Sequence, residues 1–293
     1  MIQRYQHPFR FYFFSTLIPW VFWFIAAYLS HRSDSQEFDI YISVLGLAGL
    51  FGPLFVAGYY IGGDRRILTD VSSRVFNVTS ANYRYFVFAF ALMPASIILA
   101  MAISLMFGYS ANQFIITGHA TFSSGVLPVW FILVLAPVLE ELAWHSYGTD
   151  CLRQKYSLFA TSIIFGLIWM IWHMPLAFIK GYYHSNLVLE GAIYGFNFMF
   201  SLFPFVLLMN WLYYKTDRNI ISAVVLHLFA NLFNEIFSTH PDSKVIQTVL
   251  LTVLTAYLLI SDRKFFFSRD YQEETDPGAP KSTFAIKEER SQS

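Results

Sequence analysis

Ionisable and amide side chains interrupt three of the most apolar stretches of this chain. In chain order, the stretches contribute Glu140, Glu141 and His145; His173; and His227 and Asn231. A charged or strongly polar group within lipid is costly, so each of these residues requires a structural or functional explanation.

Helical spacing indicates which of these side chains can act together. Glu141 and His145 are four residues apart, so they lie on one helix face and can form a hydrogen bond. His227 and Asn231 have the same spacing in another stretch. Glu140 lies about 100° around its helix from Glu141, so it is expected to point elsewhere, toward the interior of the bundle.

This set of side chains is suited to hydrolysis. A carboxylate can act as a general base toward water, imidazole can share or donate the proton, and a His/Asn pair can stabilise an oxyanion. The sequence does not establish a cofactor, and Glu140, His173 and His227 are also a possible set of zinc ligands. There is no HExxH motif, so the residues alone do not choose between metal-free and zinc chemistry.

Each residue also has a purely structural interpretation. Glu140 and Glu141 could be a solvated pair at the inner end of their helix, because Asp150 and Arg153 follow soon after. His173 and His227 could simply form hydrogen bonds between helices. Contributions from three separate stretches favour a shared polar site within the membrane.

The composition requires lipid as the main solvent. Of 293 residues, 56% are hydrophobic and 13% are charged, whereas a soluble domain has roughly 25% charged residues. The net charge of zero gives no indication of a nucleic-acid partner. The single cysteine, Cys151, excludes an internal disulfide and is expected to be a buried small side chain.

The elements that must position the site are predicted to be transmembrane helices. We expect an all-α bundle of about eight spans with both termini inside; the apolar runs are 11–29, 42–62, 85–107, 126–146, 158–178, 188–213, 220–237 and 245–261. With this topology the outer loops hold only Arg32, Lys180 and Lys244, as the positive-inside rule requires.

The domain organisation follows from these spans. Residues 1–267 form one transmembrane domain, with the polar motifs in 126–237, and the charged segment 268–293 is predicted to be a disordered cytoplasmic tail. Gly58 and Gly62 have the spacing of a close helix contact. Asn234 and Glu235 could line a water path, but their position at an outer helix end favours a solvated cap.

The three motifs together resemble the CPBP family, which contains the CAAX proteases and bacteriocin-processing enzymes of the type II CAAX prenyl endopeptidase class. That family has Glu-Glu-x-x-x-Arg, Phe-x-x-x-His and His-x-x-x-Asn motifs on separate membrane helices. Here His145 replaces the Arg and Trp169 replaces the Phe, whereas His227 and Asn231 match the third motif in full. The resemblance covers about residues 126–237.

The resemblance implies roles for these residues. Glu140 and His173 would activate water, and His227 and Asn231 would stabilise the oxyanion. Glu141 would pair with His145, with a pH sensitivity that an Arg would not give. Trp169 would support the site, and its indole N–H would need a hydrogen-bond acceptor.

We therefore expect a multi-pass intramembrane endopeptidase, in the plasma membrane if the source is bacterial. Its partners would be the lipid bilayer and a membrane-associated or lipid-modified peptide, cut near the cytoplasmic side. The alternatives are a non-catalytic scaffold or chaperone of the same fold and, third, a transporter, which the lack of an internal repeat disfavours. One difficulty is depth, because Glu140 is about 10 Å and His173 about 22 Å from the inner ends of their predicted helices.

Overall fold

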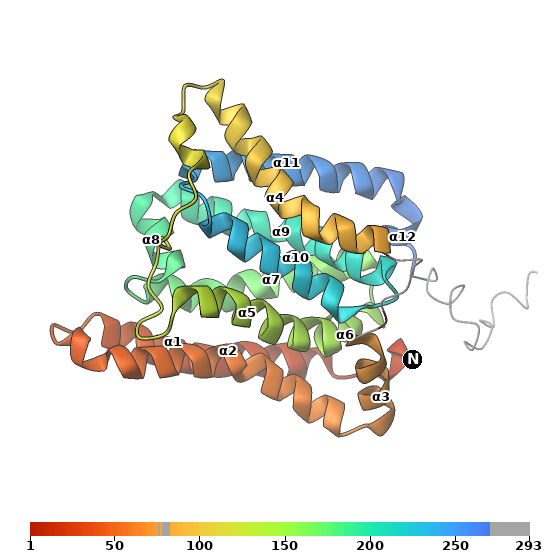
Figure 1. Cartoon of the computed structure of the whole chain (residues 1–293). Coiled ribbons are helices and arrows are strands. Elements are labelled where there is room, and N and C mark those ends of the chain that lie inside the picture. Colours follow the sequence, from red (N-terminus) through yellow and green to blue (C-terminus); the bar gives the residue numbers. More distant parts are fainter. Residues whose placement is uncertain (76, 78–82, 270–293) are drawn as a thin grey trace, which may run out of the picture.

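A computed structural model describes residues 1–75, 77 and 83–269. Apart from its first two residues, the predicted disordered tail lies outside the described residues. Regular structure in the described part is helical (Figure 1). The α-helices are α1 (Pro8–Ser30), α2 (Asp39–Gly62), α3 (Arg65–Val75), α4 (Tyr83–Leu105), α5 (Val129–Ala143), α6 (Thr149–Arg153), α7 (Leu158–His173), α8 (Tyr183–Glu190), α9 (Ala192–Lys215), α10 (Ile220–Glu235), α11 (Pro241–Ser261) and α12 (Arg263–Phe267).

Seven helical segments within the described residues are long and apolar enough to cross a membrane. They coincide with seven of the eight predicted spans. The remaining predicted span, 220–237, corresponds to α10, which has 16 residues and is shorter than the ~20 residues of a typical crossing. The chain is therefore a multi-pass integral membrane protein whose α10 is a short helix within the bundle.

The fourth span differs from its predicted end at residue 146. After α5 the chain forms a π-helical turn, Trp144–Gly148, and continues directly into α6. The whole segment runs from Val129 to Arg153. A π-turn inserts one residue into the helical repeat, and such turns are frequent at functional sites.

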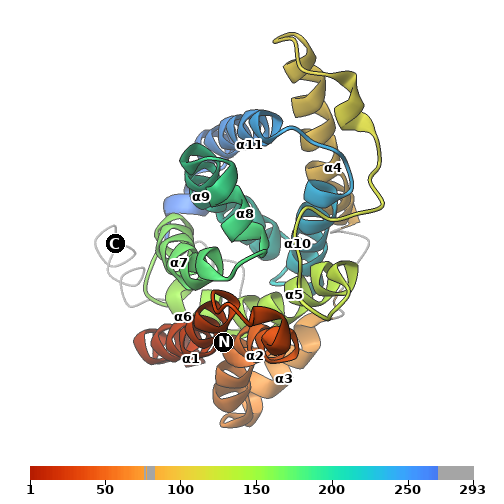
Figure 2. The ribbon, with the colours of Figure 1, turned by 90° about the vertical axis from the view of Figure 1, so that its left-hand side faces the viewer.

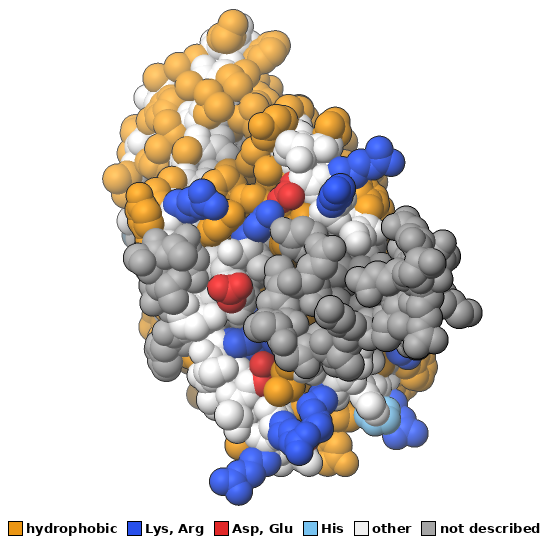
Figure 3. Space-filling view, turned by 90° about the vertical axis from the view of Figure 1, so that its right-hand side faces the viewer, with side chains coloured by type: hydrophobic (Ala, Val, Ile, Leu, Met, Phe, Trp, Pro, Cys, Tyr) orange, Lys and Arg blue, Asp and Glu red, His pale blue; other side chains and the backbone are white. Residues whose placement is uncertain are grey.

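The two ends of the bundle differ in composition. The N-terminus, α3, α6 and α12 lie at one end, and α8 lies at the other (Figures 1 and 2). Lys and Arg side chains are scattered over the first of these ends (Figure 3); we call it the cation-rich end. Ser157 and Asn219 cap the helices α7 and α10 at this end. Their side chains accept hydrogen bonds from the backbone N–H groups of Ala160 and Ser222, respectively.

Close helix packing occurs at different glycines from those predicted. A Cβ added at Gly58 or Gly62 would have no neighbour within 4 Å among the described residues, so these glycines make no close contact with a helix in that part of the chain. A Cβ at Gly49 would lie 2.2 Å from the indole nitrogen of Trp23. That indole donates a hydrogen bond to the carbonyl of Gly46 at 2.9 Å. Because Gly49 has no side chain, Trp23 of α1 can approach the backbone of α2 this closely.

The substitution Gly49→Val should therefore destabilise the pairing of α1 with α2. Overpacking of a tight contact typically costs about 1–3 kcal/mol of unfolding free energy, measurable as a lower thermal midpoint in detergent. The matched control is Gly58→Val on the same helix, which should leave the midpoint nearly unchanged. Equal effects of the two substitutions would contradict the assigned packing.

Candidate active site

Glu141 forms the centre of the polar site and is fully buried. One carboxylate oxygen pairs with Nδ1 of His145, the residue four positions on. The other accepts from Nδ1 of His227 on α10 at 2.6 Å. Glu140 is also buried, with 5% of its surface exposed, so the two glutamates are not a solvated pair.

His145 is held by a second hydrogen bond on its other ring nitrogen. Its Nε2 lies 2.9 Å from Oδ1 of Asn210 on α9, whose amide N–H₂ donates to the hydroxyl of Ser162. Ser162 in turn donates to the carbonyl of Leu158. These directions make Nε2 of His145 a donor to Asn210, while Nδ1 faces the Glu141 carboxylate.

Asn210 was not among the predicted site residues, although its position carries a signal. Asn210 is fully buried and lies within an apolar run that was predicted as the span 188–213. A polar side chain at such a position needs a partner inside the bundle. No spacing rule, however, indicates that its partner is His145, because the two residues come from different helices.

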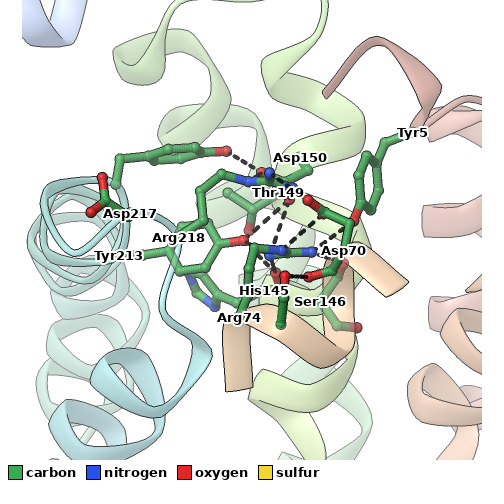
Figure 4. A network of polar contacts seen from close by, with 12 residues as sticks. Tyr5, Asp70, Arg74, His145, Ser146, Thr149, Asp150, Tyr213, Asp217 and Arg218 are labelled. Atoms are coloured by element: carbon green, nitrogen blue, oxygen red, sulfur yellow. Dashed lines mark hydrogen bonds and ion pairs between the residues drawn. The ribbon is translucent and has the colours of Figure 1, made fainter. Parts of the chain in front are cut away.

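The π-turn is held from the cation-rich end (Figure 4). Arg74 on α3 donates to the backbone carbonyls of His145 at 3.3 Å and Ser146 at 3.1 Å. The hydroxyl of Tyr213 also donates to the carbonyl of His145, at 2.7 Å. Carbonyl groups near an irregular helical turn need donors in a bilayer, and these side chains provide them.

The charge of Arg74 is balanced within the same network. Asp70 and Asp150 accept from Arg218 at 2.8 and 2.6 Å, and both lie beside Arg74. Burial opposes the charge of Arg74, but Tyr213 and Asp150 more than offset burial and hold the pKa of Arg74 above its ordinary value. The network thus fixes α3 and α9 to the segment that carries the two glutamates.

Trp169 contacts two of the predicted catalytic residues, Glu140 and His173. Its indole N–H donates to Oε2 of Glu140 at 2.9 Å. Its backbone carbonyl accepts from Nδ1 of His173, one helical turn later, at 2.7 Å. Glu140 keeps one carboxylate oxygen, and His173 keeps Nε2, for other partners.

The expected mismatch in depth between Glu140 and His173 was wrong. It assumed that the fourth span ends near residue 146, whereas the π-turn and α6 extend it to Arg153. At about 1.5 Å per residue, Glu140 is about 20 Å from Arg153 and His173 about 22 Å from Leu158. The two side chains therefore lie at similar depths.

A cavity of about 340 Å³ brings the predicted catalytic residues together: Glu140, His173, His227 and Asn231 all contribute to its lining. His184 on α8, to which the sequence analysis assigned no role, also lines it, with its ring 5.3 Å from that of His173. Burial lowers the pKa of His184 to about 4, so this neighbour of His173 is neutral near pH 7.

Asn234 and Glu235 continue the lining along α10. Glu235 is 2% exposed, so the expectation of a solvated cap at this helix end was wrong. Thr121, in the connection between α4 and α5, covers it and donates both its backbone N–H and its hydroxyl to Oε2 of Glu235. The polar lining therefore extends beyond the family motifs.

Zinc remains a prediction for Glu140, His173 and His227. Among the described residues, no three His, Cys, Asp or Glu side chains are placed to hold one ion. His227 directs Nδ1 to Glu141, and His173 directs Nδ1 to the Trp169 carbonyl.

The cavity extends from Glu140 to Thr121 and to α8, away from the cation-rich end. If that end is cytoplasmic, as the positive-inside rule predicts, the cavity faces the outer side. Cleavage near the cytoplasmic side would need the opposite orientation. The predicted orientation and the predicted side of cleavage therefore exclude each other.

Comparisons with known proteins agree with the motif resemblance. Residues 122–233 match the family model for type II CAAX prenyl endopeptidases of the Rce1-like type. A CAAX prenyl protease 2 of Methanococcus maripaludis is 35% identical over 272 residues, which cover 92% of this chain and 99% of that protein.

We expect Asn210→Leu to leave the Nε2–H of His145 without an acceptor. An unsatisfied buried donor lowers the free energy of unfolding by about 1–3 kcal/mol, and by more if the group is charged. The loss is measurable as reduced stability to heat or denaturant in detergent. Asn197→Leu is the control, because Asn197 lies on the same helix and makes no hydrogen bond to the described part of the chain. If the two variants are equally stable, the assigned role of Asn210 is wrong.

Orientation can be measured by labelling single cysteines. In a Cys151→Ala background, Ser33→Cys lies in the connection between α1 and α2, and Ser73→Cys lies on α3; both sites are exposed. With cations inside, a membrane-impermeant maleimide should label position 33 in intact cells and position 73 only after lysis. The reverse pattern would show that the cavity faces the cytoplasm.

Proposed function

Because the chain belongs to the Rce1-like type II CAAX prenyl endopeptidase family, we propose that it hydrolyses a peptide bond of a lipid-modified substrate through Glu140, His173, His227 and Asn231. The observation that carries this proposal is the link through Trp169. Trp169 positions the carboxylate of Glu140 and the imidazole of His173 at the wall of the same cavity. One oxygen of Glu140 and Nε2 of His173 are left to bind water.

In the first step, water lies between Glu140 and His173. Glu140 takes a proton through the oxygen that Trp169 leaves unused, and Nε2 of His173 accepts a hydrogen bond from the same water. The resulting hydroxide attacks the carbonyl carbon of the substrate. A positioned base of this kind typically contributes about 10²–10⁴-fold to the rate.

The oxyanion that forms is stabilised from α10. Glu141 holds Nδ1 of His227, which leaves Nε2 for the cavity. With Nε2 protonated, His227 and the amide of Asn231, one turn later, donate to the oxyanion. The buried negative charge of Glu141 favours this protonated ring.

Collapse of the tetrahedral intermediate breaks the carbon–nitrogen bond. The proton that Glu140 took from water passes to the leaving amine, so Glu140 returns to its starting state. The products are a new carboxyl group on the lipid-bearing part, which keeps the second proton of the water until it ionises in solvent, and a released peptide with a free amino group. No cofactor enters these steps.

The direct test compares the purified wild-type protein with Glu140→Gln and His173→Ala on a prenylated C-a-a-X peptide, each with and without a chelator. Loss of an acid/base group should lower kcat/KM by about 10²-fold or more. The control is Glu190→Gln, which removes an exposed carboxylate at the cavity edge and should retain activity.

Two outcomes would change the proposal. If no variant and no wild-type preparation cuts the peptide while all remain folded and bind it, the chain is a scaffold of the same fold. If the chelator abolishes cleavage and added zinc restores it, a metal ion rather than the bare side chains activates the water.

A further inference from the structure

One face of α10 forms a polar wall along the cavity. His227, Asn231, Asn234 and Glu235 all line it, at the i, i+4, i+7 and i+8 positions of a single helix face. From His227 to Glu235 this wall rises eight residues, or about 12 Å. The family motif accounts for only its first two members.

Lys244 lies where this wall ends. Of the described residues that line the cavity, Lys244 alone is a lysine or arginine, and 15% of its side chain is exposed. Its ammonium is 3.7 Å from Oε1 of Glu235 and 5.3 Å from the ring centre of Tyr183. Pro241, in the first turn of α11, lines the cavity beside it, so the positive end of that helix dipole is near.

The contacts of Lys244 with Glu235 and with the Tyr183 hydroxyl leave at least one of its three N–H groups available. A separation of 3.7 Å is too long for a hydrogen bond, and Oε1 of Glu235 receives none from the described residues. Glu235 is instead fixed by the two donors of Thr121 on its other oxygen. An ammonium has three N–H groups, so Lys244 can bind a second carboxylate without leaving Glu235.

We propose that Lys244 binds the C-terminal carboxylate of the substrate peptide and so restricts cleavage to chain ends; this rests on the proposed function. Three extended residues span about 10–11 Å, close to the rise of the α10 wall. A scissile carbonyl at His227 then places the carboxylate of the third following residue near Lys244. Asn234 lies between them and can hydrogen-bond the extended backbone.

The spacing also agrees with the kind of substrate that the family name describes. In a C-a-a-X end the lipid-bearing cysteine is followed by three residues and a free carboxylate. Binding that carboxylate at Lys244 places the bond after the cysteine at the catalytic residues. Lys244 is thus a specificity-determining residue remote from the reacting atoms.

The experiment compares one prenylated C-a-a-X peptide as the free acid and as the C-terminal amide. Wild type should cleave the acid with a kcat/KM roughly 10-fold or more above that of the amide, mainly through KM, since hydrogen bonds to charged groups are among the stronger ones. Lys244→Met should cut both peptides equally. Lys180→Met is the control, because Lys180 is exposed at the same end of the bundle and does not line the cavity.

A double variant separates binding from folding. In Lys244→Met/Glu235→Gln no unpaired carboxylate is left buried, so the protein should fold and again show no preference for the acid. Calorimetric binding of the tripeptide acid and its amide gives a second readout that needs no cleavage. A wild type that treats acid and amide alike, or a preference that survives Lys244→Met, would overturn the proposal. Acid-selective binding without cleavage would support Lys244 and reject the hydrolase.

Discussion

A carboxylate buried between two imidazoles is the interaction on which the rest of this site depends. Removing a charged group from water costs several kcal/mol, which only well-placed partners offset. Glu141 obtains these partners from His145 on its own span and His227 on α10. Because His145 needs a further acceptor, Asn210 on α9 is also fixed. One buried charge therefore sets the mutual positions of the helices around the cavity.

The two departures from the family motifs, His145 and Trp169, each form hydrogen bonds that the structure shows. An Arg at position 145 would carry its own charge and several donors, whereas His145 has two ring nitrogens, which contact Glu141 and Asn210. A Phe at position 169 would have no polar group, whereas the indole of Trp169 donates to Glu140. Both replacements thus form hydrogen bonds within the site, so neither leaves a buried donor unpaired.

The sequence was sufficient for what local rules determine. Apolar length predicted the spans, and the i, i+4 spacing predicted the contact of Glu141 with His145. It was insufficient where contacts join distant segments: Asn210 and His184 have no sequence relation to their partners. The π-turn was also missed, because nothing in Trp144–Gly148 distinguishes it from a regular helix, and this error caused the wrong depth for Glu140. The tight glycine, Gly49, depends on where Trp23 packs.

The polar character of the fourth span also affects how the protein is made. This span is the least hydrophobic of the seven candidate spans among the described residues, and charged residues near a helix centre each oppose insertion by about 2.5–3.5 kcal/mol. The partners of its glutamate and histidine, Asn210 and His227, are synthesised later. During translation the polar side chains of this span therefore lack these partners until α9 and α10 have been synthesised. Until then the span must be accommodated beside α1 and α2 or within the insertion machinery.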